Sequence, residues 1–221
     1  MNIIFDLDGT LIDPEVGICR SVVYAFEQMA LPVPPAARLR SFIGPPLQAS
    51  FEATIPNATA ADIERAIALY RERFASVGLF ENQVYPLIPE VLEALRGSDH
   101  QLLVATSKPW IFAEKILDHF GLSPFFHFIH GSELDGQRSH KADLLAFVLQ
   151  QRGLSAEQCL MVGDRSYDVA GAIANGILAV GVSWGYGTRE EFAEAQAVID
   201  EPTALLKLVA GLYPTKSTPE G

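Results

Sequence analysis

Two aspartates, Asp6 and Asp8, follow the apolar run Asn2–Phe5 near the N-terminus. Side chains two residues apart on a strand point to the same face, so both carboxylates face one small volume if the strand continues that far. Gly9 then permits a turn, and Thr10 offers a hydroxyl and a backbone N–H group. Because ligands of open α/β sheets collect at the carboxyl ends of the strands, this strand end is a candidate ligand site.

A second acidic site lies later in the chain. Asp164 follows the apolar run Cys159–Val162 and a glycine, and Asp168 comes four residues further on. If a helix starts near Asp164, these two carboxylates lie on one helix face. At an effective dielectric constant near 20, a pair of like charges about 4 Å apart costs about 4 kcal/mol. Four converging carboxylates must therefore bind protons or a cation, and hard oxygen ligands favour Mg²⁺.

Two further strand ends carry polar groups. Thr106 and Ser107 follow the apolar run Gln101–Ala105 and stand just before a predicted helix. Helix N-termini favour phosphate, and a helix-capping role for Thr106 is compatible with phosphate binding. Lys141 opens another predicted helix, and taken alone it reads as a surface lysine.

The elements that must position these residues alternate between strands and helices. Predicted strands are short and apolar, and they cover Asn2–Phe5, Gln101–Ala105, Phe126–Ile129, Cys159–Val162, Leu178–Val182 and Ala197–Ile199. Predicted helices show one apolar side or a terminal glycine, and they cover Pro89–Arg96, Pro109–Phe120, Lys141–Arg152, Ser166–Asn175 and Thr203–Tyr213. This alternation predicts an α/β fold with a Rossmann-like, doubly wound parallel sheet.

Residues 14–81 break the alternation with helical patterns only. Asp13 and Pro14 form a helix start, Pro32–Pro35 ends that helix, and Thr59 with Asp62 resembles a capping box for another. We expect a small all-helical cap inserted after the first strand, with hinges at residues 12–15 and 78–83. The expected division is a core of residues 1–13 and 82–213, a cap of residues 14–81, and a flexible tail of residues 214–221.

Composition limits the function classes. The chain has 221 residues, 49% of them hydrophobic, and a formal net charge of −11. Such a charge repels nucleic acid and anionic membranes, so neither is an expected partner, and a small anionic substrate needs local cations. The N-terminus has neither the basic flank nor the unbroken apolar run of a signal peptide or membrane span. We expect a cytoplasmic monomer or homodimer with Cys19 and Cys159 reduced.

Together and in this order, the four polar pieces resemble the motifs of the haloacid dehalogenase (HAD) superfamily. Asp6–Thr10 matches the first motif, Thr106 the second, Lys141 the third, and Gly163–Asp168 the fourth. Ala142 stands where the family usually has proline after the lysine. The helical insert resembles the C1-type cap. Three stretches resemble the phosphoglycolate phosphatase-like branch, which includes 5′-nucleotidases; they are Phe42–Leu47, Gly131–Gly136 and Val182–Gly187.

The resemblance implies a Mg²⁺-dependent phosphatase. It implies that Asp6 attacks phosphorus and becomes an aspartyl-phosphate, while Asp8 acts as general acid and then as general base. The metal is expected on the Asp6 carboxylate, the Asp8 main-chain carbonyl and Asp164. Asp168 is expected either to ligate the metal, through water or directly, or to anchor Lys141 or a loop amide. Lys141 is expected to neutralise charge on Asp6 and on the phosphate.

Other residues are expected to contact the substrate. Thr106, Ser107 and Thr10 are the predicted phosphate contacts. Gly44 lies in a cap loop that either faces the leaving group or is an ordinary helix–helix turn. The cap residues Tyr70, Arg71 and Arg73 are expected to lie on a solvated helix face rather than at the site.

The substrate is expected to be a small phosphorylated metabolite. Phosphoglycolate is the first prediction and a nucleoside monophosphate the second. A β-phosphoglucomutase-like phosphomutase stays an alternative, because the family uses the same core for that reaction. Asp8 and Asp164 argue against a dehalogenase, which needs neither. A binding protein that has lost its activity is disfavoured, because every catalytic group is present.

Overall fold

The computed structural model describes residues 1–98 and 100–212. Its main sheet has six parallel strands in the order β5-β4-β1-β6-β7-β8. The strands share an apolar composition, and they are β1 (Asn2–Phe5), β4 (Gln101–Pro109), β5 (Phe128–Ser132), β6 (Cys159–Gly163), β7 (Leu178–Val182) and β8 (Ala197–Ile199). The first strand lies at the centre, between β4 and β6, which confirms the predicted α/β class.

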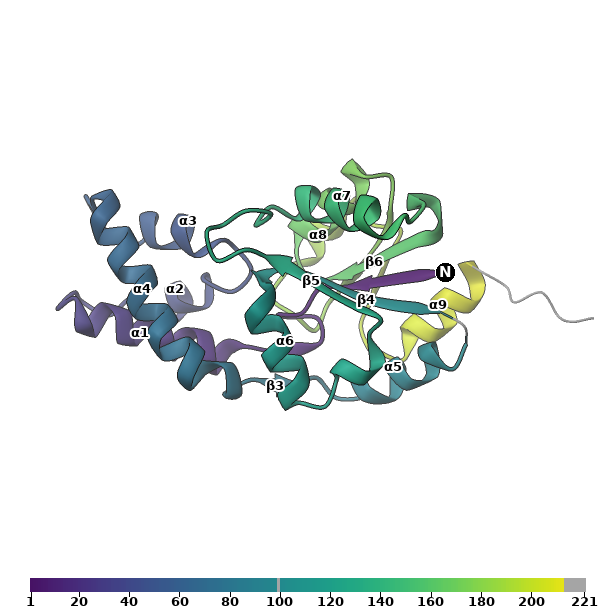
Figure 1. Ribbon diagram of the computed structural model, residues 1–221, viewed down its shortest axis with the longest axis horizontal. Coiled ribbons are helices and arrows are strands. Elements are labelled where there is room, and N and C mark those ends of the chain that lie inside the picture. The colour runs from purple at the N-terminus through teal and green to yellow at the C-terminus, as the bar shows by residue number, and fades with distance from the viewer. Residues whose placement is uncertain (99, 213–221) are drawn as a thin grey trace, which may run out of the picture.

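Helices cover both faces of this sheet (Figure 1). On one face lie α7 (Lys141–Arg152) and α8 (Ser166–Ala174), and on the other α5 (Ile88–Arg96), α6 (Trp110–His119) and α9 (Ala204–Leu212). Ile4 and Met161 are buried with the first pair of helices, whereas Ile3 and Leu160 are buried against the second group. Successive strand residues thus face opposite apolar layers, which is why these strands read as continuous apolar runs.

Most predicted elements form within one or two residues of their expected bounds, and the largest differences lie at β4 and β5. β4 runs on through Thr106 to Pro109, so Pro109 rather than Thr106 precedes the helix. The predicted capping role of Thr106 is therefore wrong. β5 begins and ends later than predicted, because a 3₁₀ turn at Ser123–Phe125 occupies the residues before it. The predicted tail of residues 214–221 lies outside the described residues.

Four helices follow the first strand without any intervening strand of the main sheet. They are α1 (Glu15–Gln28), α2 (Ala36–Arg40), α3 (Leu47–Glu52) and α4 (Ala60–Ser76), and they gather at the carboxyl end of the sheet (Figure 1). The predicted capping box forms: Thr59 accepts from the Asp62 backbone N–H, and Asp62 accepts from that of Thr59. α3 was not predicted, because its six residues are too few to show a helical period.

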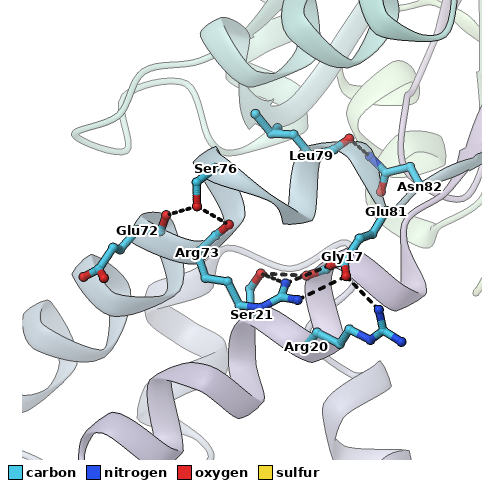
Figure 2. Close-up of polar contacts among 9 residues, drawn as sticks. All are labelled: Gly17, Arg20, Ser21, Glu72, Arg73, Ser76, Leu79, Glu81 and Asn82. Carbon is cyan, nitrogen blue, oxygen red and sulfur yellow. Dashed lines mark hydrogen bonds and ion pairs between the residues drawn. The ribbon is translucent and has the colours of Figure 1, made fainter.

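Two chain segments join this helical group to the sheet. They pair as a short antiparallel ribbon of β2 (Ile12–Asp13) and β3 (Gln83–Val84), at the two predicted hinge regions. Just before β3, Glu81 forms ion pairs with Arg73 of α4 and Arg20 of α1, as Figure 2 shows. The second connecting segment is thereby tied to the helical group rather than to the sheet.

No helix among the described residues is both long and apolar enough to span a membrane. Cys19 and Cys159 are free thiols.

Candidate active site

The acidic pair near the N-terminus sits where the central strand ends. β1 stops at Phe5, although the Asp6 backbone N–H still donates to Val162 at 2.9 Å. The chain then turns, with Gly9 at φ +80° and the Leu11 N–H donating to the Leu7 carbonyl. The turn, rather than the period of a strand, therefore places the Asp8 carboxylate.

Lys141 lies at the centre of a buried ion-pair network. Its Nζ is 2.9 Å from Asp6 Oδ1 and 2.8 Å from Asp168 Oδ1, and it donates to the Ala105 carbonyl at 2.8 Å. Burial opposes the charge of this lysine, but Asp168 and Asp6 together outweigh burial and raise its pKa. Lys141, the first residue of α7, is thus a buried cation at the carboxyl end of the sheet. The interpretation of Lys141 as a surface lysine is wrong.

Asp164 and Asp168 converge with Asp6. One carboxylate oxygen from each of the three lies within 4.8 Å of the others. The helix starts only at Ser166, so Asp164 precedes it, and helical spacing is not what brings this pair together. Asp164 Oδ2 accepts from the Tyr186 backbone N–H at 2.8 Å, and Asp168 Oδ2 accepts from that of Arg165 at 3.1 Å.

Burial makes this cluster electrostatically costly. Desolvation, reinforced by Asp168 and Asp6, raises the pKa of Asp164 well above its ordinary value. Desolvation also raises the pKa of Asp168 to about 6, although Lys141 opposes the shift. Three carboxylates face one ammonium, so the cluster keeps an excess of negative charge when all of its groups are ionised.

The cluster fits a hard divalent cation. Asp164 Oδ1 is buried and has no hydrogen-bond partner among the described residues. The backbone approaches closely here, because a Cβ at Gly9 would lie 2.1 Å from Asp164 Oδ2. An unpartnered carboxylate oxygen beside two more carboxylates is the donor set that Mg²⁺ prefers.

Asp8 has a different lysine partner. Lys108 Nζ lies 2.8 Å from Asp8 Oδ2, and both side chains are largely buried. Desolvation raises the pKa of Asp8, Lys108 opposes the shift, and Asp6 adds to it. Sequence reasoning missed Lys108. The available signal was a lysine two residues beyond Thr106, on a segment read as a loop rather than as the end of β4.

The three predicted phosphate contacts, Thr106, Ser107 and Thr10, have different surroundings. Thr106 is buried in β4 and accepts from the Lys108 backbone N–H at 3.3 Å. Ser107 lines a cavity that also exposes Asp8 and Lys108. Thr10 instead lines a separate small cavity with Phe5 and Trp184, and its Oγ1 has no partner among the described residues. Thr10 is therefore not among the residues that line the cavity beside Asp8.

The cavity beside Asp8 has a volume of about 550 Å³ and lies between the sheet edge and the helical group. The wall that the helical group contributes is aromatic and includes Phe42, Tyr70 and Phe74. Gly44, at φ +102°, also lines it, as the loop prediction allowed. Apolar walls with a few polar groups are typical of small-molecule sites.

Two expectations for α4 are wrong. Tyr70 is 4% exposed, and both Tyr70 and Arg71 line the cavity rather than a solvated face. Packing against Phe51 and Phe74 holds Tyr70 at the cavity, and a hydrogen bond to the Leu134 carbonyl holds Arg71 there. Arg73 lies elsewhere, in the ion pair with Glu81 (Figure 2).

A doubly wound sheet with lysine-paired carboxylates at its carboxyl edge, beneath helices inserted after the first strand, defines a class of phosphate-processing hydrolases. The family model for haloacid dehalogenase-like hydrolases matches residues 3–182, and the chain belongs to this family. A predicted phosphatase from Clostridium acetobutylicum has the same fold, with a TM-score of 0.89, 38% identity, and coverage of 95% of this chain and 98% of that one.

Three of the similar curated proteins carry different names. A 5′-nucleotidase of Pseudomonas aeruginosa is 50% identical over 195 residues, 88% of each protein. Tyrosine-protein kinase PtkA of Mycobacterium tuberculosis is 41% identical over 192 residues, 87% of this chain but 65% of that one. A phosphoglycolate phosphatase of Pseudomonas putida is 31% identical over 212 residues, 92% of this chain and 78% of that one. The chain is a HAD-type phosphatase, with phosphoric monoester hydrolysis as its reaction class.

Proposed function

We propose that this phosphatase hydrolyses a small phosphomonoester in two steps through an aspartyl-phosphate on Asp6. The observation that carries the proposal is the separate lysine pairing of the two aspartates, Asp6 with Lys141 and Asp8 with Lys108. Asp6 shares its lysine with a second carboxylate, whereas Asp8 lines the cavity and has a raised pKa. One carboxylate is thereby suited to attack and the other to carry a proton.

In the first step an Asp6 carboxylate oxygen forms a bond to phosphorus as the ester P–O bond breaks. Protonated Asp8 gives its proton to the departing oxygen, and the alcohol leaves. In the second step Asp8 takes a proton from water, whose oxygen attacks phosphorus. The acyl-phosphate P–O bond breaks, which restores the Asp6 carboxylate and releases phosphate. The raised pKa of Asp8 favours its protonated form at the start.

The remaining predicted residues hold charge and position. Lys141 keeps Asp6 in place, and Thr106 and Ser107 lie on the adjacent strand end, where we place the phosphoryl oxygens. When bound, Mg²⁺ would lie on Asp6, the Asp8 main-chain carbonyl and Asp164, where it supplies neutralisation of phosphoryl charge. We keep Asp168 as an anchor for Lys141, because their 2.8 Å ion pair supports that role.

We also propose that residues 14–81 act as a cap that excludes water during the reaction. Two hydrogen bonds join the cap to the core near the cavity, in addition to the contact between the Phe74 and Phe112 rings. Arg71 donates to the Leu134 carbonyl at 2.7 Å, and Arg165 donates to the Ile43 carbonyl at 2.9 Å. The paired β2 and β3 segments are then the hinges, and a cytoplasmic phosphometabolite is the proposed substrate.

Two substrate candidates have support among the relatives. Phosphoglycolate is the substrate in the name of one relative, and a nucleotide is implied by the name of the 50% identical one. The cavity volume of about 550 Å³ favours the nucleotide, because a two-carbon leaving group would leave much of the aromatic wall uncovered.

Phosphate release from a panel of phosphometabolites, with Mg²⁺ and with EDTA, tests the proposal. We expect Asp6→Asn to reduce turnover at least about a thousandfold, as loss of a nucleophile does. Asp143→Asn, which changes an exposed aspartate of α7, is the matched control. Full turnover by Asp6→Asn would exclude the aspartyl-phosphate route. A hexose 1-phosphate that is converted to its 6-phosphate without free phosphate would identify a phosphomutase instead.

A further inference from the structure

Tyr70 is fixed by aromatic neighbours within the cap. Its ring stacks on Phe74, with centroids 5.2 Å apart and planes 15° apart, and meets Phe51 edge-on at 6.5 Å. The side chain is 4% exposed. Such packing leaves the ring little freedom, so the position of the hydroxyl is set before any ligand binds.

The hydroxyl of Tyr70 has no hydrogen-bond partner among the described residues, although the residue lines the cavity. Because Tyr70 lines the cavity, its hydroxyl can be reached by a group of a bound ligand. Burial, reinforced by the charge of Asp8, raises the pKa of Tyr70 well above its ordinary value. The phenol is therefore neutral, and its hydroxyl is free to donate a hydrogen bond to an acceptor in the cavity.

Contacts link this tyrosine to the reacting end of the cavity. Lys108 Nζ lies 4.4 Å from the centroid of the Phe74 ring, and the same ammonium pairs with Asp8. One aromatic ring thus separates Tyr70 from the proposed acid/base pair. We therefore place a group that hydrogen-bonds to Tyr70 in the leaving group rather than in the phosphoryl group.

The charges around the cavity indicate which leaving group fits. Apart from the ion pair of Asp8 with Lys108, the charged lining residues are three carboxylates and the cation Arg71; the carboxylates are Glu64, Glu133 and Asp135. Glu133 is paired with Arg138, outside that lining. Arg71 uses Nη2 for the Leu134 carbonyl, and its buried Nε has no partner. An anionic tail would meet more carboxylates than cations, whereas a neutral hydroxylated group would accept from donors already in place.

We propose that Tyr70 determines leaving-group specificity by donating a hydrogen bond to a hydroxyl or ring oxygen of a neutral, sugar-like leaving group. The inference rests on the proposed phosphatase function and names the substrate class of that site. A free pentose phosphate and the pentose of a nucleoside monophosphate offer the same acceptor chemistry. Tyr70 touches the part of the substrate that is released and takes no part in bond breaking.

The test compares Tyr70→Phe with Tyr24→Phe on adenosine 5′-monophosphate, ribose 5-phosphate and phenyl phosphate, in Mg²⁺. Tyr24 is the matched control, because its hydroxyl bonds Glu72 on the cap and does not line the cavity. Phenyl phosphate has no acceptor in its leaving group apart from the ester oxygen. Thermal unfolding of each variant shows whether the cap keeps its stability.

We expect Tyr70→Phe to lower kcat/KM about three- to tenfold on the sugar-containing esters, the range of one neutral hydrogen bond, and less than twofold on phenyl phosphate. Deoxy analogues of the affected substrate should identify the group that Tyr70 contacts. On the analogue that lacks this group, Tyr70→Phe and the wild type should have the same kcat/KM. Tyr24→Phe should not change the ratio between substrates.

Several results would overturn the inference. One is an equal loss on all substrates, and another is no loss on either sugar-containing ester. The third is wild-type turnover of phenyl phosphate without turnover of the sugar-containing esters. If Tyr70→Phe lowers the unfolding temperature and leaves the ratio of kcat/KM between substrates unchanged, the result is treated as an equal loss on all substrates. If the wild type releases phosphate from phosphoglycolate but from none of these esters, the inference is overturned and the proposed function stands. If it releases phosphate from neither these esters nor phosphoglycolate, the proposed function is overturned together with the inference.

Discussion

The two sides of the cavity are held in place by different forces. On the sheet side, Asp6, Asp8 and Asp168 are fixed by ion pairs to buried lysines at 2.8–2.9 Å. On the cap side, Tyr70 and Phe74 are fixed by aromatic packing. Charge pairs in a dry site resist displacement and tune proton affinity, whereas packed rings set shape. The sheet side therefore suits bond breaking, and the cap side suits choice of substrate.

The two sides also differ in how rigidly they are attached. Asp6 and Asp8 follow β1, and Lys108 lies in β4. Asp168 lies in α8, which follows β6, and β1, β4 and β6 are hydrogen-bonded neighbours in one sheet. The cap wall reaches the sheet through two connecting segments and a few side-chain contacts such as Arg71 with Leu134. Changes on the sheet side should thus alter every substrate equally, and changes on the cap side should alter substrates selectively.

Removal of Lys141 is the strongest way to break the sheet side. We expect Lys141→Met to lower the free energy of unfolding by about 3–5 kcal/mol at neutral pH in EDTA, because it leaves Asp6 and Asp168 buried without a cation. Urea unfolding measures the change. Lys115→Met, at an exposed position of α6, is the control. A loss below about 1 kcal/mol would show that the cluster takes up protons at little cost.

Lys108 tests the point where the two sides meet. We expect Lys108→Met to lower kcat about a hundredfold on phenyl phosphate and on sugar-containing esters alike, because Asp8 loses the cation that positions its carboxylate. Steady-state kinetics on both substrate types, with Lys115→Met as control, measures it. A loss confined to one substrate type would assign Lys108 to the cap side of the comparison.

Much of the sheet side could be predicted from sequence, because its residues stand at fixed places relative to apolar strands. Asp6, Asp164 and Lys141 follow from short-range spacing and from the order of the four motifs. The bounds of β4 could not be predicted, because Thr106–Pro109 contains no apolar residue before the proline that would signal a buried strand. Lys108 was missed for that reason.

The cap side could be predicted only as far as its helices. The spacing of Ile63, Tyr70 and Phe74 indicates an apolar stripe on α4, and the capping box indicates where the helix begins. Which ring of that stripe borders a cavity depends on how Phe51 and Phe112, distant in sequence, pack against it. Contacts of this kind leave no periodic trace in the chain.

The acid cluster predicts a dependence of stability on pH when no metal is bound. The pKa of Asp168 is raised to about 6 in the folded protein, so between its ordinary value and about 6 the folded state binds more protons than the unfolded state. The stability contributed by this group is therefore lost as pH rises through that window. Mg²⁺ should restore about 2.7 kcal/mol at a concentration one hundred times its dissociation constant.

Unfolding in EDTA at several pH values between 4 and 7, for the wild type and for Asp168→Asn, isolates this contribution. As pH rises, the free energy of unfolding of the wild type should fall relative to that of Asp168→Asn. A difference that is constant with pH would mean that Asp168 keeps an ordinary pKa. An absence of stabilisation by Mg²⁺ at neutral pH would argue against a cation at the cluster.

The attachment of the cap can be weakened without touching either wall of the cavity. Glu81 accepts from Arg73 through both carboxylate oxygens and pairs with Arg20 at 2.7 Å, and it lies two residues before β3 (Figure 2). We expect Glu81→Gln to lower the free energy of unfolding by about 1 kcal/mol, since this network is only partly buried. Because the cap wall keeps its aromatic packing, kcat/KM should change less than about twofold on phenyl phosphate and on sugar-containing esters.

Hydrogen–deuterium exchange of residues 78–84, beside urea unfolding, distinguishes a loosened connection from a general loss of stability. Exchange should rise in this segment and in β2, with Glu27→Gln on α1 as the exposed control. A selective loss of turnover on the sugar-containing esters would show that the ion pairs at the hinge, and not only the rings beside the cavity, set the position of Tyr70. The cap side would then depend on charge as the sheet side does. The two walls would differ only in their distance from the phosphorus atom.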